Sequence, residues 1–372
     1  MTNLKIVFIC GSIEPGRDGV GDYTRRLAGE VIRQGNEASI ISINDSFSTT
    51  VNSNTQIDDD ITITVYRLPK TLSRNKRFQQ LHTWIQQLDP NWLSLQFVAY
   101  SFHDKGLPFL LGKNLSQISK ERNWHIMFHE LWVGLANDEK IKYRIMGGVQ
   151  KKIIAHLITK LSPKVIHTQT ELYKREIGYI GYTSKLLSLP SNIPITSKIT
   201  NTTNTIAMVI FGSIYPNAPY QIFAKEVATY LKETKQKATL TLIGRNGHEK
   251  NNWVSAFKSN NIPVTVLGEQ SVSSISNVLS NSTLGVITTP AYLLEKSGSA
   301  AALRLHQLPI INVAKSWVPK RYFKYDAQND VLVYSSGNFS AIKNLNTSKG
   351  ETNSIHKVAE NFISSLNVIK SN

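Results

Sequence analysis

Residues 285–313 read GVITTPAYLLEKSGSAAALRLHQLPIINV. The apolar strand predicted over Leu284–Thr288 ends in a loop that closes on Glu295–Ser299, a run of charged, Gly and Ser residues. Small residues over about Ala300–His306 predict a short helix, and Pro309–Val313 predicts a second strand. A strand–loop–helix–strand unit of this kind is typical of a parallel α/β sheet.

The Gly/Ser turn before this helix predicts a phosphate site. A helix N-terminus presents unpaired N–H groups and a partial positive charge, both of which suit a phosphate. Glu295 precedes the turn, where a carboxylate accepts hydrogen bonds from hydroxyls on the molecule that carries the phosphate. The residues therefore predict a nucleotide-sugar site, with the diphosphate on the helix start and the sugar hydroxyls on Glu295.

The same segment resembles the donor-site signature of retaining glycosyltransferases of family 4, which have the GT-B fold. The family pattern runs roughly Pro-Ser-x-x-Glu-Gly-Phe-Gly-Leu, a helix, and then Gly-Leu-Pro-Val-Ile. The corresponding residues here are Thr289-Pro290, Glu295 to Ser299 and Gln307 to Ile311. Leu303 stands where the family usually carries a second Glu that binds the nucleotide ribose. The resemblance implies donor contacts from Lys296, Ser297, Gly298 and Ser299, and no metal or other cofactor beside the nucleotide diphosphate sugar.

The length and composition agree with a two-domain globular enzyme. The chain has 372 residues, of which 41% are hydrophobic and 18% charged. No apolar run approaches the roughly 18–20 residues of a membrane span. The single cysteine, Cys10, excludes an internal disulfide and fits a reducing compartment, so we expect a cytoplasmic protein.

The net charge of +16 favours anionic partners. Nucleotides, lipid phosphates and anionic membrane surfaces are candidates. Nucleic acid is not, because zinc-finger spacing and RNP-like aromatic motifs are missing from the sequence. Two basic clusters contain no acid and would suit either a peripheral position on the inner face of a membrane or solvated helix faces. The first comprises Arg67, Lys70, Arg74, Lys76 and Arg77, and the second comprises Lys140, Lys142, Arg144, Lys151, Lys152, Lys160 and Lys164.

Strand and helix patterns alternate in both halves of the chain. The first half opens with an apolar strand over Lys5–Cys10 and a helix over about Asp22–Gln34, and it includes a strand over Trp124–Phe128. Residues 44–60 are rich in Asn, Ser, Thr and Asp and are predicted as a surface loop. The alternation restarts after Ser188–Asn204, a polar stretch that we interpret as a linker.

This alternation predicts an α/β fold with two Rossmann-like domains facing across a cleft, which is the GT-B arrangement. The predicted boundaries are 1–190 for an N-terminal acceptor domain and 205–353 for a C-terminal donor domain. Residues 354–372 are predicted as a closing helix, with packing back on the first domain as one option.

Two loops of the first half are candidate site segments. Gly19 and Gly21 lie between the first strand and the first helix, where the backbone of glycine approaches a ligand closely; a flexible turn is the competing interpretation. The resemblance implies that these glycines touch the donor phosphate and that this region shapes the acceptor side, with Arg17 and Tyr23 as contacts. His129 follows a strand, and the family has a His there that reaches the donor sugar.

Glu130, next to His129, is a candidate for orienting it or for contacting the acceptor. In the second half, Gly212-Ser213 follows a strand where the family typically carries an Arg and, several residues later, a Lys that clamp the diphosphate. Neither cation is present, because Ser213 and Asn217 stand near those positions. Arg245 and Lys296 are candidate replacements, since a leaving diphosphate still needs neutralising.

Gly268 and Glu269 follow another strand, and the resemblance implies that the backbone just past this glycine pairs with the nucleotide base. The Asp-x-Asp motif within Asp58–Asp60 lies in a polar segment of a chain with GT-B organisation, and we interpret it as unrelated to metal binding. The histidines and Cys10 show no metal-ligand spacing.

The sequence therefore predicts a retaining glycosyltransferase that moves a hexose-type sugar from a nucleotide diphosphate sugar to a glycan, lipid-linked or other acceptor. His129 and Glu295 are the catalytic candidates, and no protein nucleophile is assigned. Polysaccharide biosynthesis is the expected setting. Two alternatives stay open: a catalytically impaired GT-B module that binds a partner, and another nucleotide-sugar enzyme such as an epimerase.

Overall fold

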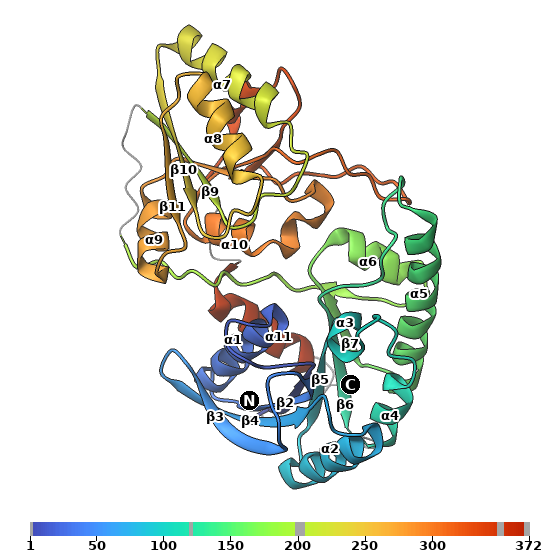
Figure 1. Ribbon diagram of the computed structural model, residues 1–372. Coiled ribbons are helices and arrows are strands. Elements are labelled where there is room, and N and C mark those ends of the chain that lie inside the picture. The colour runs from blue at the N-terminus through green and yellow to red at the C-terminus, as the bar shows by residue number, and fades with distance from the viewer. Residues whose placement is uncertain (1–2, 119–121, 198–204, 348–352, 368–372) are drawn as a thin grey trace. The chain divides into compact units, whose positions relative to one another are not determined.

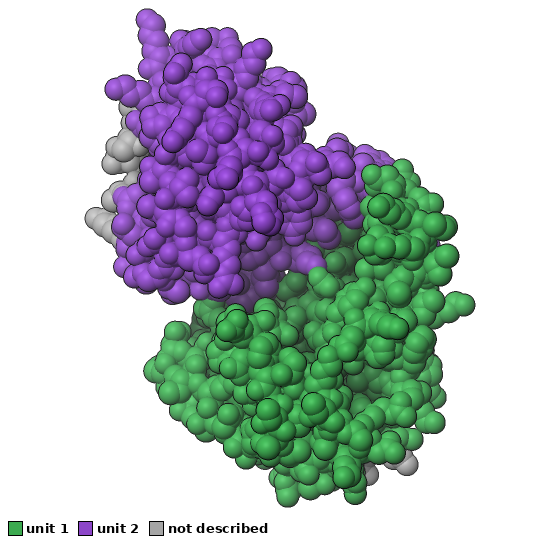
Figure 2. All heavy atoms as spheres, in the orientation of Figure 1, with its two compact units in different colours: residues 1–187, 355–372 green, residues 188–354 purple. Residues whose placement is uncertain are grey.

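The computed structural model describes residues 3–118, 122–197, 205–347 and 353–367. The chain divides into two compact units, unit 1 with residues 1–187 and 355–372, and unit 2 with residues 188–354 (Figure 2). Each unit is built on a sheet with helices packed against it, mostly parallel in unit 1 and parallel in unit 2 (Figure 1). This confirms the predicted α/β class with two Rossmann-like domains. The last part of the predicted linker, 198–204, lies outside the described residues.

Unit 1 contains a sheet of eight described strands in the order β3-β4-β2-β1-β5-β6-β7-β8. Its strands are β1 (Lys5–Cys10), β2 (Glu37–Asp45), β3 (Asn52–Asp58), β4 (Ile61–Pro69), β5 (Trp92–Phe97), β6 (Asn123–Phe128), β7 (Val165–Thr168) and β8 (Lys185–Leu186). Its helices are α1 (Gly19–Arg33), α2 (Arg74–Leu88), α3 (Ala99–Phe102), α4 (Leu111–Gln117), α5 (Ile141–Leu161), α6 (Glu171–Gly178) and α11 (Ile355–Asn367).

The expected surface loop at residues 44–60 is wrong over its second half. Residues Asn52–Asp58 form β3, which pairs antiparallel with β4 at the edge of the sheet. An edge strand with both faces largely in water needs no apolar alternation, because the ladder hydrogen bonds with its neighbour hold it. The polar composition of residues 52–58 therefore did not predict this strand.

Helix α11 packs on unit 1, far in sequence from the rest of that unit. Its buried residues Val358, Ala359, Phe362 and Leu366 form a stripe at helical spacing. The Phe362 ring lies 5.7 Å from the ring of Phe8 on β1, measured between centroids. His356 Nδ1 lies 2.9 Å from Glu30 Oε1 on α1, which adds a polar contact at the start of the helix. The end of the chain thus completes the core of unit 1.

Unit 2 contains a sheet of six described strands in the order β11-β10-β9-β12-β13-β14, all parallel. Its strands are β9 (Thr205–Phe211), β10 (Lys237–Ile243), β11 (Val264–Gly268), β12 (Leu284–Ile287), β13 (Ile310–Asn312) and β14 (Val331–Val333). Its helical segments are α7 (Tyr220–Thr234), α8 (Lys250–Ser259), α9 (Val272–Ser280), η1 (Ala291–Lys296), α10 (Gly298–Leu305) and η2 (Phe339–Asn344).

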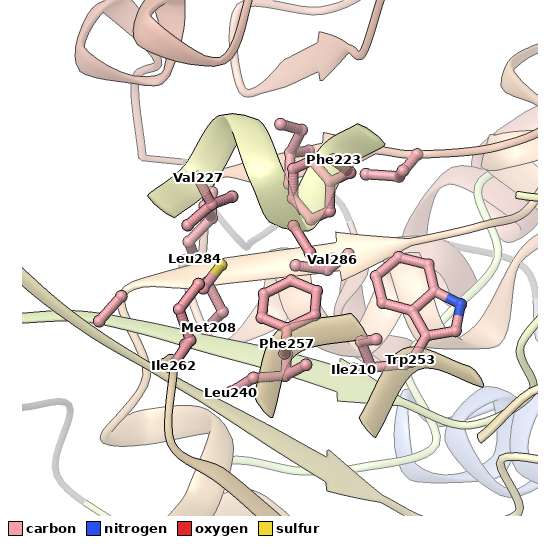
Figure 3. Packing of buried hydrophobic residues seen from close by; sticks show 14 of the residues in the cluster. Met208, Ile210, Phe223, Val227, Leu240, Trp253, Phe257, Ile262, Leu284 and Val286 are labelled. Carbon is pink, nitrogen blue, oxygen red and sulfur yellow. The ribbon is translucent and has the colours of Figure 1, made fainter. Parts of the chain in front are cut away.

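This order runs outward from β9 in both directions, as in a Rossmann sheet, and it reverses between β9 and β12. Neighbouring residues of β9 face opposite layers: Met208 and Ile210 join one core cluster and Val209 joins the other. Figure 3 shows the first cluster, in which Phe223 of α7 and Trp253 of α8 cover the sheet. A sheet buried on both faces explains the continuous apolar strands in the sequence.

Candidate functional site

The loops after β9 and β12 meet at the carboxyl edge of the unit 2 sheet, where its strand order reverses. Gly212 follows β9 with φ +81°, and an added Cβ there would lie 2.6 Å from Ser299 Oγ in the first turn of α10. Gly212 is therefore required both by its backbone conformation and by this close approach. Ligands of open α/β sheets bind at such a reversal point, outside the carboxyl ends of the strands.

Two side chains that the sequence interpretation missed hold the loop after β9. Asn246 is buried, and its Nδ2 donates to Gly212 O at 2.8 Å and to Ile243 O at 3.3 Å. The hydroxyl of Thr288 at the end of β12 accepts a 2.7 Å hydrogen bond from Tyr215 N. An Asn within a Gly-Arg-Asn-Gly turn is a detectable signal, since Asn side chains commonly bond nearby backbone groups.

The start of α10 fits the predicted anion site. Ser297 caps it, with its hydroxyl accepting from Ala300 N at 3.3 Å, and the first turn carries no acidic residue. Gly298 is exposed, and a Cβ added there would meet nothing within 4 Å. The helix dipole therefore places partial positive charge at an accessible backbone beside Gly212.

Glu295 lies in η1, just before this cap. Its Oε1 accepts a 3.0 Å hydrogen bond from the Tyr325 hydroxyl. Burial raises the pKa of the Glu295 carboxyl above its usual range, and the Tyr325 hydrogen bond and the charge of Arg304 oppose that rise. Arg304 itself is buried and bonds Asp330 Oδ2 through Nε at 2.8 Å. Glu295 is thus held in a defined position in a partly buried setting.

Leu303 is fully buried in the core between α10 and the sheet. A Cβ added at Gly285 of β12 would lie 2.6 Å from Leu303 Cδ1, so the two residues pack in close contact. This position contributes to the core, and the ribose contact of the resembled family has no counterpart here.

The candidate cations of unit 2 differ in their surroundings. Arg245 Nε lies 2.8 Å from Glu269 Oε2, in an ion pair whose side chains are 79% and 67% exposed. Two predicted donor-binding residues are thus each other's partners, and Arg245 would have to leave Glu269 to neutralise a phosphate. Lys296 is half-buried at the end of η1, next to the cap Ser297. Gly268, with φ +67°, accepts from Gly244 N through its carbonyl at 2.7 Å.

In unit 1, the start of α1 carries a side-chain cap. Asp18 caps α1, and its Oδ1 accepts from Val20 N at 2.9 Å and from Gly21 N at 2.8 Å. An anionic cap occupies the place that a phosphate would take. Gly21 has a packing reason as well, since an added Cβ would lie 2.7 Å from Ser12 O, whereas Gly19 meets nothing within 4 Å. Donor contact by either glycine stays a prediction.

His129 lies at the end of a chain of buried hydrogen-bonded side chains. His129 Nε2 lies 2.9 Å from Gln96 Oε1, and Gln96 Nε2 donates to Ser94 Oγ at 2.8 Å. Ser94 Oγ lies 2.8 Å from His125 Nδ1, and His125 Nε2 lies 3.0 Å from His167 Nδ1. The residues come from neighbouring strands β5, β6 and β7, and all are less than 10% exposed.

The Gln96 amide sets the direction of its own two bonds in this chain. Its NH2 donates to Ser94, so its oxygen faces His129 and accepts from a protonated Nε2. Burial lowers the pKa of His125 well below its ordinary value and that of His167 to about 4, so both rings are neutral at pH 7. His129 is consequently oriented by a satisfied internal network.

Tyr23 and His129, predicted separately, lie together. Their rings meet edge to face with centroids 4.6 Å apart. Tyr23 is buried, and its hydroxyl has no hydrogen-bond partner among the described residues. Arg17 and Glu130 are both exposed. The carboxyl edge of unit 1 thus presents an aromatic–imidazole pair whose orientation comes from the sheet beneath it.

The described residues contain no group of three or more His, Cys, Asp or Glu side chains placed to hold a metal ion. Asp60, from the Asp-x-Asp motif, is ion-paired with Arg33 at 2.7 Å. Among the same residues, no helix has the length and apolar character needed to span a membrane.

Comparison with solved structures supports the fold at low sequence identity. No family model matches this chain, and no curated protein matches it in sequence. HepE of Anabaena, solved with UDP and glucose, is 11% identical with a TM-score of 0.57, covering 98% of this chain and 100% of that one. The trehalose 6-phosphate synthase of Burkholderia multivorans is 9% identical with a TM-score of 0.56, covering 100% and 99%.

The catalytic domain of starch synthase IV from Arabidopsis thaliana, solved with ADP and acarbose, is 10% identical with a TM-score of 0.52, covering 99% and 98% of the two chains. These likenesses extend over both units, and together with the two Rossmann-like sheets they show that the chain has the GT-B fold.

Proposed function

We propose that the protein is a glycosyltransferase that takes a hexose-type sugar from a nucleotide diphosphate sugar and transfers it with retention of configuration, without a metal. The observation that carries the proposal is the contact between Gly212 and Ser299 at the reversal point of the unit 2 sheet, beside the start of α10. It brings a glycine turn and a helix N-terminus free of acids to one place, which suits a diphosphate. Structural neighbours solved with UDP or ADP agree with a nucleotide ligand.

The residues have distinct proposed roles. Backbone groups of Gly298 and Ser299 bind the diphosphate, and Glu295 accepts hydrogen bonds from sugar hydroxyls through the oxygen that Tyr325 does not use. His129 contacts the sugar, with its ring oriented by the hydrogen bond between Nε2 and Gln96 Oε1. The acceptor is a glycan or a lipid-linked molecule, with Arg17, Tyr23 and Glu130 as candidate contacts.

Lys296 is the proposed replacement for the diphosphate-clamping cations of the resembled family. It adjoins the Ser297 cap at the start of α10, whereas Arg245 follows β10. A cation beside the leaving diphosphate stabilises the negative charge that grows there in the transition state. Lys296→Ala should therefore lower kcat by about tenfold to a thousandfold, and Arg245→Ala should lower it much less. If neither substitution changed turnover, no clamp would be supplied by these residues.

The donor site is tested by a pair of substitutions at Gly298. The site accepts a side chain without collision, and an acid in the first turn of a helix does not harm its stability. Gly298→Glu places a negative charge where the diphosphate would bind, and Gly298→Gln is the neutral control of the same shape. We expect the Glu variant to bind UDP, ADP or another nucleoside diphosphate at least about tenfold more weakly than the Gln variant.

Binding is measured by calorimetry and by thermal stabilisation, since a ligand of the folded state raises stability by about 2.7 kcal/mol at a hundred times its Kd. Equal affinities of the two variants would contradict binding of the diphosphate at the start of α10. Turnover of a nucleotide-sugar panel then separates transfer from epimerisation by the identity of the product.

An impaired GT-B module that binds a partner is the second candidate. Ser213, Asn217 and the buried Leu303 favour it, because they stand where the resembled family usually carries donor-binding residues. Nucleotide binding without sugar hydrolysis or transfer, across the panel and with Lys296 intact, would support this candidate.

A further inference from the structure

Unit 1 contains a cavity of about 560 Å³ at the carboxyl ends of β2, β4 and β5, between α2 and the segment that runs from α3 into α4. Its size lies within the range of small-molecule sites. It belongs to neither the unit 2 donor site nor the His129 region described above. Its lining has a basic part and an apolar part.

The basic part of the lining comprises Lys70, Arg74, Arg77 and Lys105. Asp104 is the one acidic residue in the described lining, and it is ion-paired with Lys70. Arg74 and Lys105 are exposed at the cavity. The lining therefore carries an excess of positive charge that its own acid does not balance.

Arg77 is the buried part of this charge. Its Nη1 donates to Asn44 Oδ1 at 3.0 Å, and its Nη2 donates to the carbonyls of Lys70 and Leu72 at 2.7 and 2.9 Å. These acceptors are all neutral, and the Nε of Arg77 is buried without a hydrogen-bond partner among the described residues. A partly buried guanidinium that meets only neutral acceptors is stabilised when an anion binds beside it.

The first turn of α2 adds to the same field. Its cap residue, Ser73, makes no side-chain capping bond, and the turn carries no acid. Arg74, Lys76 and Arg77 lie there instead, where the helix dipole disfavours cations. An anion in the cavity would satisfy both the dipole and these cations.

The apolar part of the lining consists of large side chains. Phe78, Phe102 and Leu107 line the cavity, and Phe109 and Leu110 lie at its edge with 56% and 40% of their surface exposed. Large exposed apolar side chains beside a basic pocket suit a ligand with an anionic head and an apolar tail.

We propose that this cavity binds a lipid phosphate, with the phosphate against Arg77, Arg74 and Lys105 and the hydrocarbon chain over Phe102, Phe109 and Leu110. The site is separate from sugar transfer and does not require that the lipid be the acceptor. A nucleotide is the less suitable occupant, because much of the lining, including Phe102, Phe109 and Leu110, is apolar and suits a hydrocarbon chain.

The experiment measures binding of the full chain to dodecyl phosphate below its micelle concentration by calorimetry. Inorganic phosphate supplies the head alone, dodecyl maltoside supplies the chain alone, and AMP supplies a nucleotide phosphate. We expect dodecyl phosphate to bind at least about tenfold more tightly than inorganic phosphate or the maltoside, and AMP binding to be unaffected by the cavity substitutions below. Equal or tighter binding of inorganic phosphate would overturn the lipid assignment, as would equal binding of the maltoside or AMP binding that the cavity substitutions weaken.

Substitutions locate the site. Arg74→Glu with Lys105→Glu reverses exposed charges, and Phe109→Ser removes exposed apolar surface, so neither should prevent folding. Each should weaken dodecyl phosphate binding by about tenfold. Lys164→Glu and Ile57→Ser, exposed residues near the amino ends of β7 and β4, are the matched controls and should leave binding unchanged.

Equal losses in the control variants would show non-specific binding and overturn the proposal. Because the probe carries neither nucleotide nor sugar, its failure to bind would leave the donor-site proposal intact, and failure of the Gly298 test would leave this one intact.

Discussion

The buried histidines of unit 1 show how single residues are tolerated in a core. A polar ring inside a sheet is destabilising unless its nitrogens find partners. Here Ser94 and His167 provide them for His125, and the ring of Phe362 packs edge-on against His125 with centroids 5.0 Å apart. The neutral form is the one that fits, because no carboxylate bonds either ring and burial disfavours the charge.

This predicts a dependence of stability on pH. The unfolded histidines take up a proton near pH 6.5, whereas in the folded protein the pKa of His167 is about 4 and that of His125 is also well lowered. Between these values the unfolded state binds more protons, so stability is complete above about pH 6.5 and falls as the pH is lowered. The free energy of unfolding, followed by urea denaturation from pH 7 to pH 5, should fall by up to about 1.4 kcal/mol per pH unit for each ring.

The control is the double variant His125→Gln/His167→Gln, whose amides can accept and donate like neutral imidazole but do not titrate. Its stability should vary much less over the same range. A slope equal to that of the original protein would mean that other groups cause the pH dependence.

Asp18 is a helix-cap signal that the analysis of the sequence did not use. An Asp directly before a predicted helix is an N-cap signal, and it was present in the loop that was assigned to phosphate. Gly19 and Gly21 were assigned to the site because glycine permits close approach of a ligand. Gly21 instead approaches the backbone of Ser12, and its own amide donates to the Asp18 cap.

At the scale of elements, helix α5 shows how one face is fitted to its neighbours. A Cβ at Gly147 would lie 1.9 Å from Val133 O, whereas a Cβ at the next residue, Gly148, would meet nothing within 4 Å. The segment after β6 is also bonded to this helix, since Val133 N donates to Gln150 Oε1 at 2.9 Å. Gly147 and Gly148 are neighbours in the sequence, yet close packing requires a glycine only at position 147.

We predict opposite effects of alanine at these positions. Gly147→Ala should lower the free energy of unfolding by about 1–3 kcal/mol, because the backbone of Val133 must move. Gly148→Ala is the matched control and should raise it by about 0.5–1 kcal/mol through better helix propensity at an exposed position. Chemical denaturation measures both, and similar effects of the two substitutions would contradict the packing of α5 on this segment.

At the scale of the whole molecule, the chain returns to its first unit at the end. The described contacts of Phe362 are with Phe8, His125 and His167, all in unit 1. Helix α11 thereby packs against the histidine chain of unit 1 and forms part of the core of that unit.

Phe362→Ala should lower the stability of unit 1 by about 3–5 kcal/mol, since it empties a fully buried site. Hydrogen exchange followed by mass spectrometry should show loss of protection in β1, β6 and β7, with the unit 2 strands unchanged. Ser364→Ala, on the exposed face of the same helix, is the control and should stay within about 0.5 kcal/mol. Loss of protection confined to unit 2 would contradict this placement of α11.

The sequence by itself determined the α/β class, the two Rossmann-like domains and most strands of the parallel sheets. Continuous apolar runs such as Lys5–Cys10 and Leu284–Thr288 predict such strands, because both faces of a parallel sheet are buried and its strands are therefore apolar throughout. Gly212, Ser297 and Gly298 were likewise recognisable, because a turn or cap needs particular residue types at particular places.

Tertiary structure alone decided which of those residues meet. The polar edge strand β3, the pairing of Arg245 with Glu269, the chain from His129 to His167 and the basic cavity beside α2 all join residues that are distant in sequence. Polar contacts of this kind depend on distances of about 3 Å between side chains on different elements. Local patterns carry no information on such distances, which is why the burial of Leu303 and the partner of Glu295 emerged only from the fold.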